Sequence, residues 1–366
     1  MCRTLVAPVL LACALACGAE PQPQSAFPLW NSQESIAEYA KRVNLPATKT
    51  LELGNGVNLE LVLIPAGKFI MGTPEPKPVY EYAFHKKVVV GKAVLAVGVG
   101  VLLVLIGSAI LRAKREKRRF QYSLRRFMAM AFCASLCVLG GMHWWYSTCG
   151  LQEARAEYIA AKAKSDPDEY PAHEVTITNP FYMGKYEVTQ EQYQQAKVGN
   201  PSFSKGSKLP VEQVSWGEAQ EFCKKVSEKT GQAVRLPTEA EWEFACRAGT
   251  TTAYCKGDTE AGLGRVAWYY ANTKWTTHPV GEKKPNEWGL YDMHGNVSEW
   301  CGDWYGKYEA AAATDPQGPA TGTRRVWRGG SSWSQIPGNC RSAKRDGSPL
   351  NRVCDLGFRL VLAGPP

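Results

Sequence analysis

Hydrophobic and polar positions follow two different periods in the first 73 residues of the 366-residue chain. Residues 31–44 have the pattern of a short amphipathic helix, and Asn31 with Glu34 three positions later has the spacing of a capping box. Residues 51–73 read as two strands joined by a glycine-flanked turn. We therefore expect a helix and linker over 25–50, and the first strands of a folded domain over 51–73.

Two apolar segments follow, at residues 93–111 and 128–146, each with 19 residues and no Asp, Glu, Lys or Arg. As a helix, 19 residues measure about 28 Å, close to a hydrocarbon layer of about 30 Å. Residues 112–126 between them carry eight Lys or Arg and one Glu. Because basic loops tend to stay in the cytoplasm, the pattern predicts an insertion over 74–165 that holds a transmembrane hairpin with a cytoplasmic basic loop. A buried helical hairpin is the alternative.

The N-terminal 24 residues have the pattern of an export signal: one Arg, an apolar run and small residues before a Pro-rich stretch. Residues 1–24 are therefore expected to be a signal peptide or a lipoprotein leader. Cys13 and Cys17 each follow a small residue, as a lipid-modified cysteine would. An uncleaved anchor stays open. Together with the hairpin, this predicts a membrane protein whose main domain is extracytoplasmic, in the periplasm or at the cell surface.

Residues 166–366 have a third pattern, with short apolar runs, dense turn residues and nine of the twelve Trp. Local capping signals predict two helices there, one after Ser215 with Glu218 at the box position and one after Thr238 with Glu241. We expect this main body to be held together by aromatic burial and cross-links more than by long regular elements.

The net charge of +9 is local, since residues 112–126 contribute +7 of it and the remaining chain only +2. A nucleic-acid binder needs basic residues spread over a folded face, so we expect no nucleic-acid partner. Six of the twelve cysteines lie outside the leader and the apolar segments, and none forms a C-x-x-C pair. An even set in an exported domain favours disulfides over a zinc site, but the sequence does not choose among the pairings.

Seven segments, in order, resemble the formylglycine-generating enzyme family, also called sulfatase-modifying factors. They are IPAGKFIMGT (64–73), HEVTITNPFYMGKYEVTQEQY (173–193), LPVEQVSWGEAQEFC (209–223), RLPTEAEWEFACRAGT (235–250), GLYDMHGNVSEWCGDWY (289–305), RVWRGGSSW (325–333) and LGFRLV (356–361). The resemblance implies an α+β fold, a variant of the C-type-lectin-like fold with little regular secondary structure. Residues 74–165, with the predicted hairpin, would interrupt this fold as an insertion.

The resemblance also implies a chemistry, because family members bind copper(I) through two cysteines after a Gly-Gly-Ser motif and convert a substrate cysteine to formylglycine. Here Ser334 stands at the first cysteine position, and the second falls near Asn339, one residue before Cys340. A serine hydroxyl is not a copper(I) ligand, so copper is not expected. The catalytic candidates are Ser331, Ser334 and Cys340, and a structural disulfide between Cys246 and Cys340 is implied.

The family's structural Ca²⁺ site has its counterpart in YDMHGNVSEW. Carried over by position, Asp292 and Glu299 would supply carboxylates, and Gly295 and Val297 backbone carbonyls. These are the hard oxygen donors that Ca²⁺ takes. A carboxylate-capped turn without an ion is the alternative.

Two functions follow from the resemblance. One is a membrane-anchored, non-oxidising binding or scaffold module for a peptide or a glycan; the other is a formylglycine-generating oxidase that acts on a sulfatase cysteine. The sequence does not indicate an oligomeric state. The expected recognition surface of the binding module consists of Trp327, Arg328, Ser331, Ser332, Trp333 and Arg341.

Overall fold

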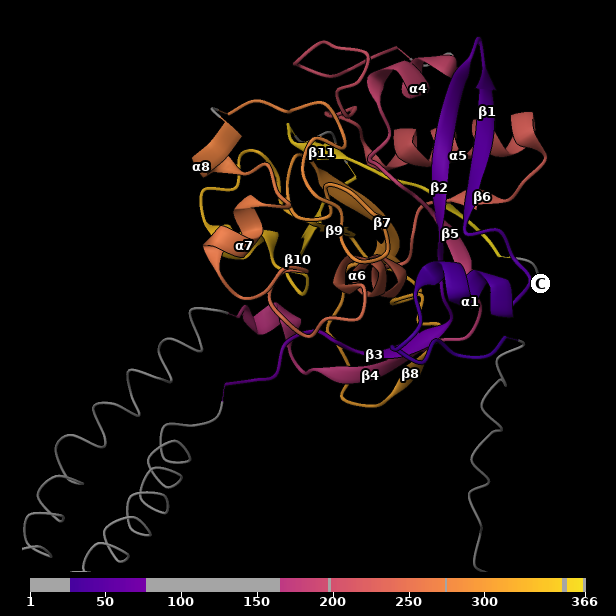
Figure 1. Ribbon diagram of the computed structural model, residues 1–366. Coiled ribbons are helices and arrows are strands. Elements are labelled where there is room, and N and C mark those ends of the chain that lie inside the picture. The colour runs from indigo at the N-terminus through magenta and orange to yellow at the C-terminus, as the bar shows by residue number, and fades with distance from the viewer. Residues whose placement is uncertain (1–26, 77–164, 197–198, 274, 351–353, 365–366) are drawn as a thin grey trace, which may run out of the picture.

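The computed structural model describes residues 27–76, 165–196, 199–273, 275–350 and 354–364 (Figure 1). The predicted leader over 1–24 lies outside the described residues. So do the predicted spans at 93–111 and 128–146 and the basic run at 112–126.

Three sheets form the framework of the domain. The first has the strand order β1-β2-β5-β12-β6, with β1 at Thr48–Gly54, β2 at Val57–Ile64, β5 at Phe181–Gly184, β12 at Val361–Leu362 and β6 at Val234–Arg235. The second has the order β10-β9-β7-β11, with β10 at Arg345–Ser348, β9 at Arg325–Arg328, β7 at Ser298–Trp304 and β11 at Leu356–Gly357. The third has the order β3-β4-β8, with β3 at Gly67–Met71, β4 at His173–Ile177 and β8 at Ala313–Thr314.

Short helices cover these sheets. They are α1 at Ile36–Arg42, α4 at Gln190–Gln195, α5 at Trp216–Thr230, α6 at Glu239–Arg247, α7 at Glu260–Gly264 and α8 at Tyr270–Thr273, with 3₁₀ turns η1 at Pro167–Glu169 and η2 at Pro337–Cys340. Figure 1 shows α6 between β3 and the second sheet, and α1 beside the first sheet. Two large apolar clusters fill the spaces between these layers, one around Tyr193, Phe222 and Trp300 and one around Trp242 and Phe244.

Local capping signals predict the two main helices correctly. Ser215 caps α5 and Thr238 caps α6, each in a complete capping box. The N-terminal helix begins later than predicted, because Ser35 with Glu38 forms its box. Asn31 instead accepts the amide hydrogens of residues 33 and 34 in a turn before the helix.

Segments on either side of residues 77–164 lie side by side in two sheets. β3 pairs with β4 in antiparallel register, with Met71 opposite His173, and β2 pairs with β5, with Leu61 opposite Gly184. The amide of Thr73 donates to the carbonyl of Glu169 at 3.1 Å. The chain therefore leaves and re-enters the domain at one place.

The predicted fold class needs correction on two counts. The domain is a mixed α/β arrangement of three sheets, with more regular pairing than predicted. The two strands predicted over 51–73 are present as β1 and β2, whereas the sheet partners from later segments were not predicted because they lie far away in the sequence. In addition, no helix among the described residues is long and apolar enough to cross a membrane. The predicted fold interrupted by a membrane-spanning hairpin, and the membrane localisation with it, are therefore not supported by the structure, and the segments that suggested them lie outside the described residues. Hydropathy alone had indicated both.

Candidate functional site

The Gly-Gly-Ser loop follows β9 and contains the candidates Ser331 and Ser334, while the third candidate, Cys340, lies on η2 and packs against Gly330. Gly330 has a φ of 71°, and a Cβ there would lie 2.8 Å from the Cys340 sulfur, so only glycine fits. The Ser331 amide donates to Ser334 Oγ at 2.9 Å, and the Ser331 hydroxyl donates to Asp355 Oδ2 at 2.6 Å. Both serines are buried. Their hydroxyls therefore hold the loop in shape.

The cysteines near this loop are buried thiols. Burial raises the pKa of the Cys340 thiol to about 12, so it is protonated at neutral pH. Cys246 and Cys340 are both free, and the predicted disulfide between them is not formed in the structure. His294 lies between their segments: its Nε2 accepts from the Cys255 amide at 3.1 Å, so its Nδ1 donates to the Cys340 carbonyl at 2.8 Å.

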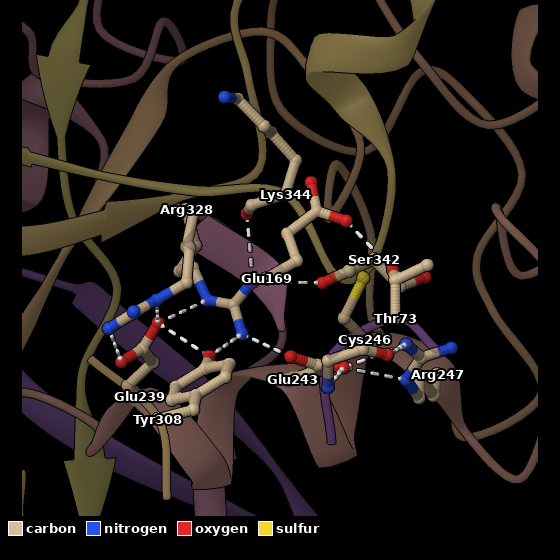
Figure 2. Close-up of polar contacts among 12 residues, drawn as sticks. Thr73, Glu169, Glu239, Glu243, Cys246, Arg247, Tyr308, Arg328, Ser342 and Lys344 are labelled. Carbon is tan, nitrogen blue, oxygen red and sulfur yellow. Dashed lines mark hydrogen bonds and ion pairs between the residues drawn. The ribbon is translucent and has the colours of Figure 1, made fainter. Parts of the chain in front are cut away.

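The two arginines of the predicted recognition surface, Arg328 and Arg341, are buried, and Figure 2 shows Arg328 next to Glu239 and Glu243. Arg328 is completely buried and pairs with Glu243, while its Nε lies 3.3 Å from Glu239 Oε1. It also donates to the carbonyls of Ser342 and Lys344, at 3.2 and 2.8 Å. These contacts engage both terminal nitrogens of the guanidinium inside the protein, so this side chain does not form part of the surface.

Further ion pairs join Arg328 in what we call the ionic network, defined as Glu239, Glu243, Arg247, Arg328 and Arg345. Nearby, Arg341 binds Glu169 through two contacts of 2.6 Å. Glu243 accepts the Gly72 amide at 2.9 Å, and Glu169 accepts the Thr73 hydroxyl at 2.7 Å (Figure 2). These contacts thus hold the described chain in place on both sides of residues 77–164.

The six residues of the predicted recognition surface therefore do not form one surface. Arg328, Arg341, Ser331 and Ser332 are buried, and Trp327 is half-buried against the first apolar cluster. Trp333 alone among the six is exposed, at 43%.

The predicted Ca²⁺ loop forms a tight turn. Asp292 has a φ of 58°, and Gly295 packs so closely that a Cβ there would lie 2.3 Å from the Trp268 carbonyl oxygen. Asp292 Oδ2 accepts the Gly281 amide at 2.8 Å, whereas its buried Oδ1 has no hydrogen-bond partner among the described residues. Burial raises the pKa of Asp292 to about 6.

The other predicted Ca²⁺ carboxylate is already engaged. Glu299 accepts from Arg359 Nε and Nη2 at 2.7 and 2.6 Å and from Trp242 Nε1 at 2.8 Å. The Val297 amide donates to Glu187 Oε1 at 2.9 Å. Desolvation and the neighbouring carboxylates raise the pKa of Glu187.

Arg359 therefore supplies a positive charge at the place where the resemblance implies an ion. Within the described ranges, no group of three or more His, Cys, Asp or Glu is arranged to hold a metal ion. The free oxygen of Asp292 is the feature of this loop that fits an added cation, and Ca²⁺ binding stays a prediction.

A different site, which the sequence did not reveal, lies beside Trp333. It is a cavity of about 140 Å³ that we call the acidic pocket. Its main lining residues are Phe203, Glu212, Trp275, Thr277, Trp333 and Asp355.

Glu212 forms the buried side of this pocket. Its side chain is only 3% exposed, and its Oε1 accepts the amides of Phe203 and Ser204 at 2.5 and 3.1 Å. The second oxygen, Oε2, is buried without a hydrogen-bond partner among the described residues. Burial raises the pKa of Glu212, and the charge of nearby Asp355 also raises it. The carboxyl group thus has one oxygen fixed and one free.

Exposed aromatic rings form the rim of the pocket, which we define as Phe203, Trp275 and Trp333. The two indoles meet edge to face, with centroids 5.3 Å apart and planes at 77°. Tyr270 meets Trp275 in the same way at 4.4 Å. Phe203 is 81% exposed and Trp275 43%. Large exposed aromatics grouped around a pocket are typical of a binding surface.

Comparisons with known proteins agree with this fold. The family model described as the sulfatase-modifying factor enzyme 1-like domain matches residues 149–363. The chaperone protein LppX of Paenibacillus barcinonensis is 31% identical over 223 residues, which cover 47% of this chain and 76% of that relative. The formylglycine-generating enzyme of Streptomyces coelicolor is 37% identical over 168 residues, covering 41% of this chain and 51% of the enzyme.

Among solved structures, Treponema denticola variable protein 1 superimposes with a TM-score of 0.59 at 26% identity, over 87% of this chain and 100% of that chain. The chain spans only about half the length of the formylglycine-generating enzyme that it matches. The family model, by contrast, covers more than half of this chain, and the family predicted from seven sequence segments is confirmed. The chain belongs to the sulfatase-modifying factor family, through a domain of the sulfatase-modifying factor enzyme 1-like type.

Proposed function

We propose that this domain is a non-oxidising binding module that takes an extended polypeptide segment across the rim of the acidic pocket. One observation carries the proposal: Trp275 and Trp333, each 43% exposed, meet edge to face beside a buried carboxyl group. Tryptophan supplies large contact area at low entropic cost, and most binding energy at interfaces comes from a few such residues.

The loop chemistry argues against the oxidase alternative. Ser334 offers a neutral hydroxyl that already accepts the Ser331 amide hydrogen. Cys340 is fully buried, and the raised pKa of its thiol keeps it protonated at neutral pH. Copper(I) is held by thiolates and other soft donors, and neither side chain supplies one.

Two observations favour a polypeptide over a glycan. The edge-to-face indoles form a corner, not the open flat platform on which a sugar ring stacks, and the cavity of about 140 Å³ suits a single side chain. One relative, similar over 76% of its length, is named a chaperone protein, and chaperones act on polypeptides.

Fluorescence anisotropy with labelled ten-residue unstructured peptides would test the proposal. We expect the double substitution Trp275→Ala and Trp333→Ala to weaken binding at least tenfold, which corresponds to about 1.4 kcal/mol. Ile70→Ala is the matched control, because Ile70 is 51% exposed but lies on β3, away from the acidic pocket. Binding of glycans but not peptides, or an equal loss in the control, would refute the proposal.

A further inference from the structure

We propose that a second cavity, between the third sheet and residues 306–319, binds a neutral small molecule with several hydroxyl groups, such as a monosaccharide. We call it the loop cavity. Its volume is about 490 Å³, and small-molecule sites commonly measure about 300–1,000 Å³. It shares no lining residue with the acidic pocket. The proposal therefore goes beyond the peptide-binding function and can fail independently of it.

Pairing in the third sheet holds the loop cavity in shape. Strand β8, which lies within residues 306–319, pairs in parallel with β4. Beside this pairing, Asp315 Oδ1 accepts the Thr178 amide hydrogen at 2.9 Å. Strand β4 also supplies His173 to the lining, and β3 supplies Met71. Hydrogen-bonded strands therefore bound the cavity on one side.

The lining contains a buried carboxyl group with one free oxygen, that of Asp303. This residue is 4% exposed, and its Oδ2 accepts the Glu239 amide hydrogen at 2.7 Å. Among the described residues, no hydrogen bond reaches Oδ1. This oxygen faces residues 306–319, since a Cβ on Gly318 would lie 3.0 Å from it. A buried acceptor without a donor costs free energy, so a ligand that donates to Oδ1 is favoured.

His173 supplies a second free acceptor. It is 8% exposed, and its Nδ1 lies 3.1 Å from the Pro171 carbonyl oxygen. Because Nδ1 donates to that carbonyl, the neutral ring has its lone pair on Nε2. No hydrogen bond from the described part of the chain reaches Nε2. The ring packs edge to face on Tyr308 at 4.9 Å, and the Tyr308 hydroxyl donates to Glu239 Oε1 at 3.0 Å (Figure 2). These contacts fix the imidazole in the cavity wall.

The charges of the lining are balanced. Glu239 is held by Arg345 through two contacts of 2.7 Å. At the exposed rim, Lys307 and Glu309 contribute one charge of each sign. Burial and the charge of Glu239 raise the pKa of Asp303 to about 7, so this carboxyl group is partly protonated at neutral pH. No sign of charge dominates, which favours a neutral ligand over a cation or an anion.

A hydroxyl is the ligand group that suits this wall. Asp303 donates a hydrogen bond when protonated and accepts one when ionised, and a hydroxyl can take either part. An ammonium group can only donate. An apolar ligand would leave both Asp303 and His173 without partners. The remaining lining includes Met71, Ala313 and Pro319, which offer apolar contact to the carbon-bound hydrogens of a sugar ring.

Matched sugars would test the proposal. Titration calorimetry and saturation-transfer NMR would be run with glucose, galactose and mannose, each beside its 2-amino derivative and its uronate. The three members of each set share a ring and differ in charge. We expect at least one neutral sugar to bind, about tenfold more tightly than its charged derivatives, because burying an uncompensated charge costs affinity.

Two substitutions test the location. Ala311 is exposed and lines the loop cavity, so Ala311→Phe should fill the space and weaken binding about tenfold or more. Ala310→Phe is the matched control, because Ala310 is equally exposed but does not line the cavity. It should bind as the wild type does.

The substitution His173→Phe tests one of the two acceptors. It keeps an aromatic ring against Tyr308 and removes Nε2, so we expect binding to weaken about tenfold. Thermal unfolding without sugar shows whether the variant folds. If it does not fold, the pair Ala311→Phe and Ala310→Phe still decides the question.

Three results would overturn the proposal. The first is that no sugar of the three sets binds. The second is that binding survives in Ala311→Phe, which would place the sugar elsewhere on the protein. The third is that an amino sugar binds more tightly than its neutral parent, which would make the loop cavity a cation site. None of them changes the expected loss of peptide binding when Trp275 and Trp333 are replaced.

Discussion

The ionic network around Arg328 and the acidic pocket around Glu212 both remove carboxyl groups from water, but they surround them differently. In the network, Glu243 contacts both Arg328 and Arg247, and Glu239 is held by Arg345 through two contacts of 2.7 Å. In the acidic pocket, Glu212 has two backbone amides and a free oxygen. A carboxylate with buried arginine partners serves the fold, whereas one left half-satisfied beside exposed tryptophans is available for binding.

The largest expected effect is in the network. Replacing Arg328 by Met leaves the buried Glu243 with one cation fewer, and such a loss costs roughly 3–5 kcal/mol of unfolding free energy. Urea denaturation measures it. The matched control is Glu174→Gln, which removes an exposed pair with Lys68 at 3.0 Å and should cost no more than about 1 kcal/mol. If the two variants lost the same free energy of unfolding, the buried ionic network would contribute no more to stability than an exposed ion pair.

A smaller effect of opposite sign is expected in the pocket. Because burial raises the pKa of Glu212 in the folded state, the wild type loses stability as the pH rises from the unfolded-state pKa to the folded one. Glu212→Gln does not titrate there, so its free energy of unfolding should exceed that of the wild type above this range. The expected gain is about 1.4 kcal/mol for each tenfold change in the acid dissociation constant.

Denaturation curves at pH 4 and pH 8 measure this difference. The advantage of Glu212→Gln should be small at pH 4 and largest at pH 8. A variant that is less stable than the wild type at both values would show that the carboxylate is satisfied in the fold, contrary to the comparison above.

The smallest expected effect concerns the Ca²⁺ loop, which combines a paired carboxylate, as in the ionic network, with a partly unpaired one, as in the acidic pocket. Glu299 is paired with Arg359, as in the network, while Asp292 keeps a free buried oxygen, as in the pocket. One bound Ca²⁺ stabilises the fold by about 0.4 kcal/mol when its free concentration equals Kd. We expect thermal unfolding to shift upward with added Ca²⁺ in the wild type and not in Asp292→Asn. An unchanged wild type would leave Arg359 as the cation of this loop.

The sequence predicts features whose residues lie close together along the chain, and it misses contacts between residues that are far apart in the chain. Capping boxes at Ser215 and Thr238 have their complete signal within four residues, so the starts of α5 and α6 are predictable. Arg328 reads as a surface residue in RVWRGG, because its partner Glu243 lies 85 positions away on α6.

The acidic pocket was missed for the same reason. Glu212, Trp275 and Asp355 come from three separate segments, and none has a neighbour in sequence that marks it as part of a site. The useful signal is the acidic residue itself, because Glu212 is the charged residue of an otherwise uncharged stretch, PVEQV. Only the fold shows that Oε2 of Glu212 receives no hydrogen bond from elsewhere along the described chain.

The contact between Thr73 and Glu169 makes this junction a position where the domain can accept inserted segments of different length. Their backbones are joined by one hydrogen bond of 3.1 Å, and buried pairs hold each side independently. A short linker could therefore close the chain there, and segments of very different length could be exchanged at this junction while the rest of the described domain remains the same.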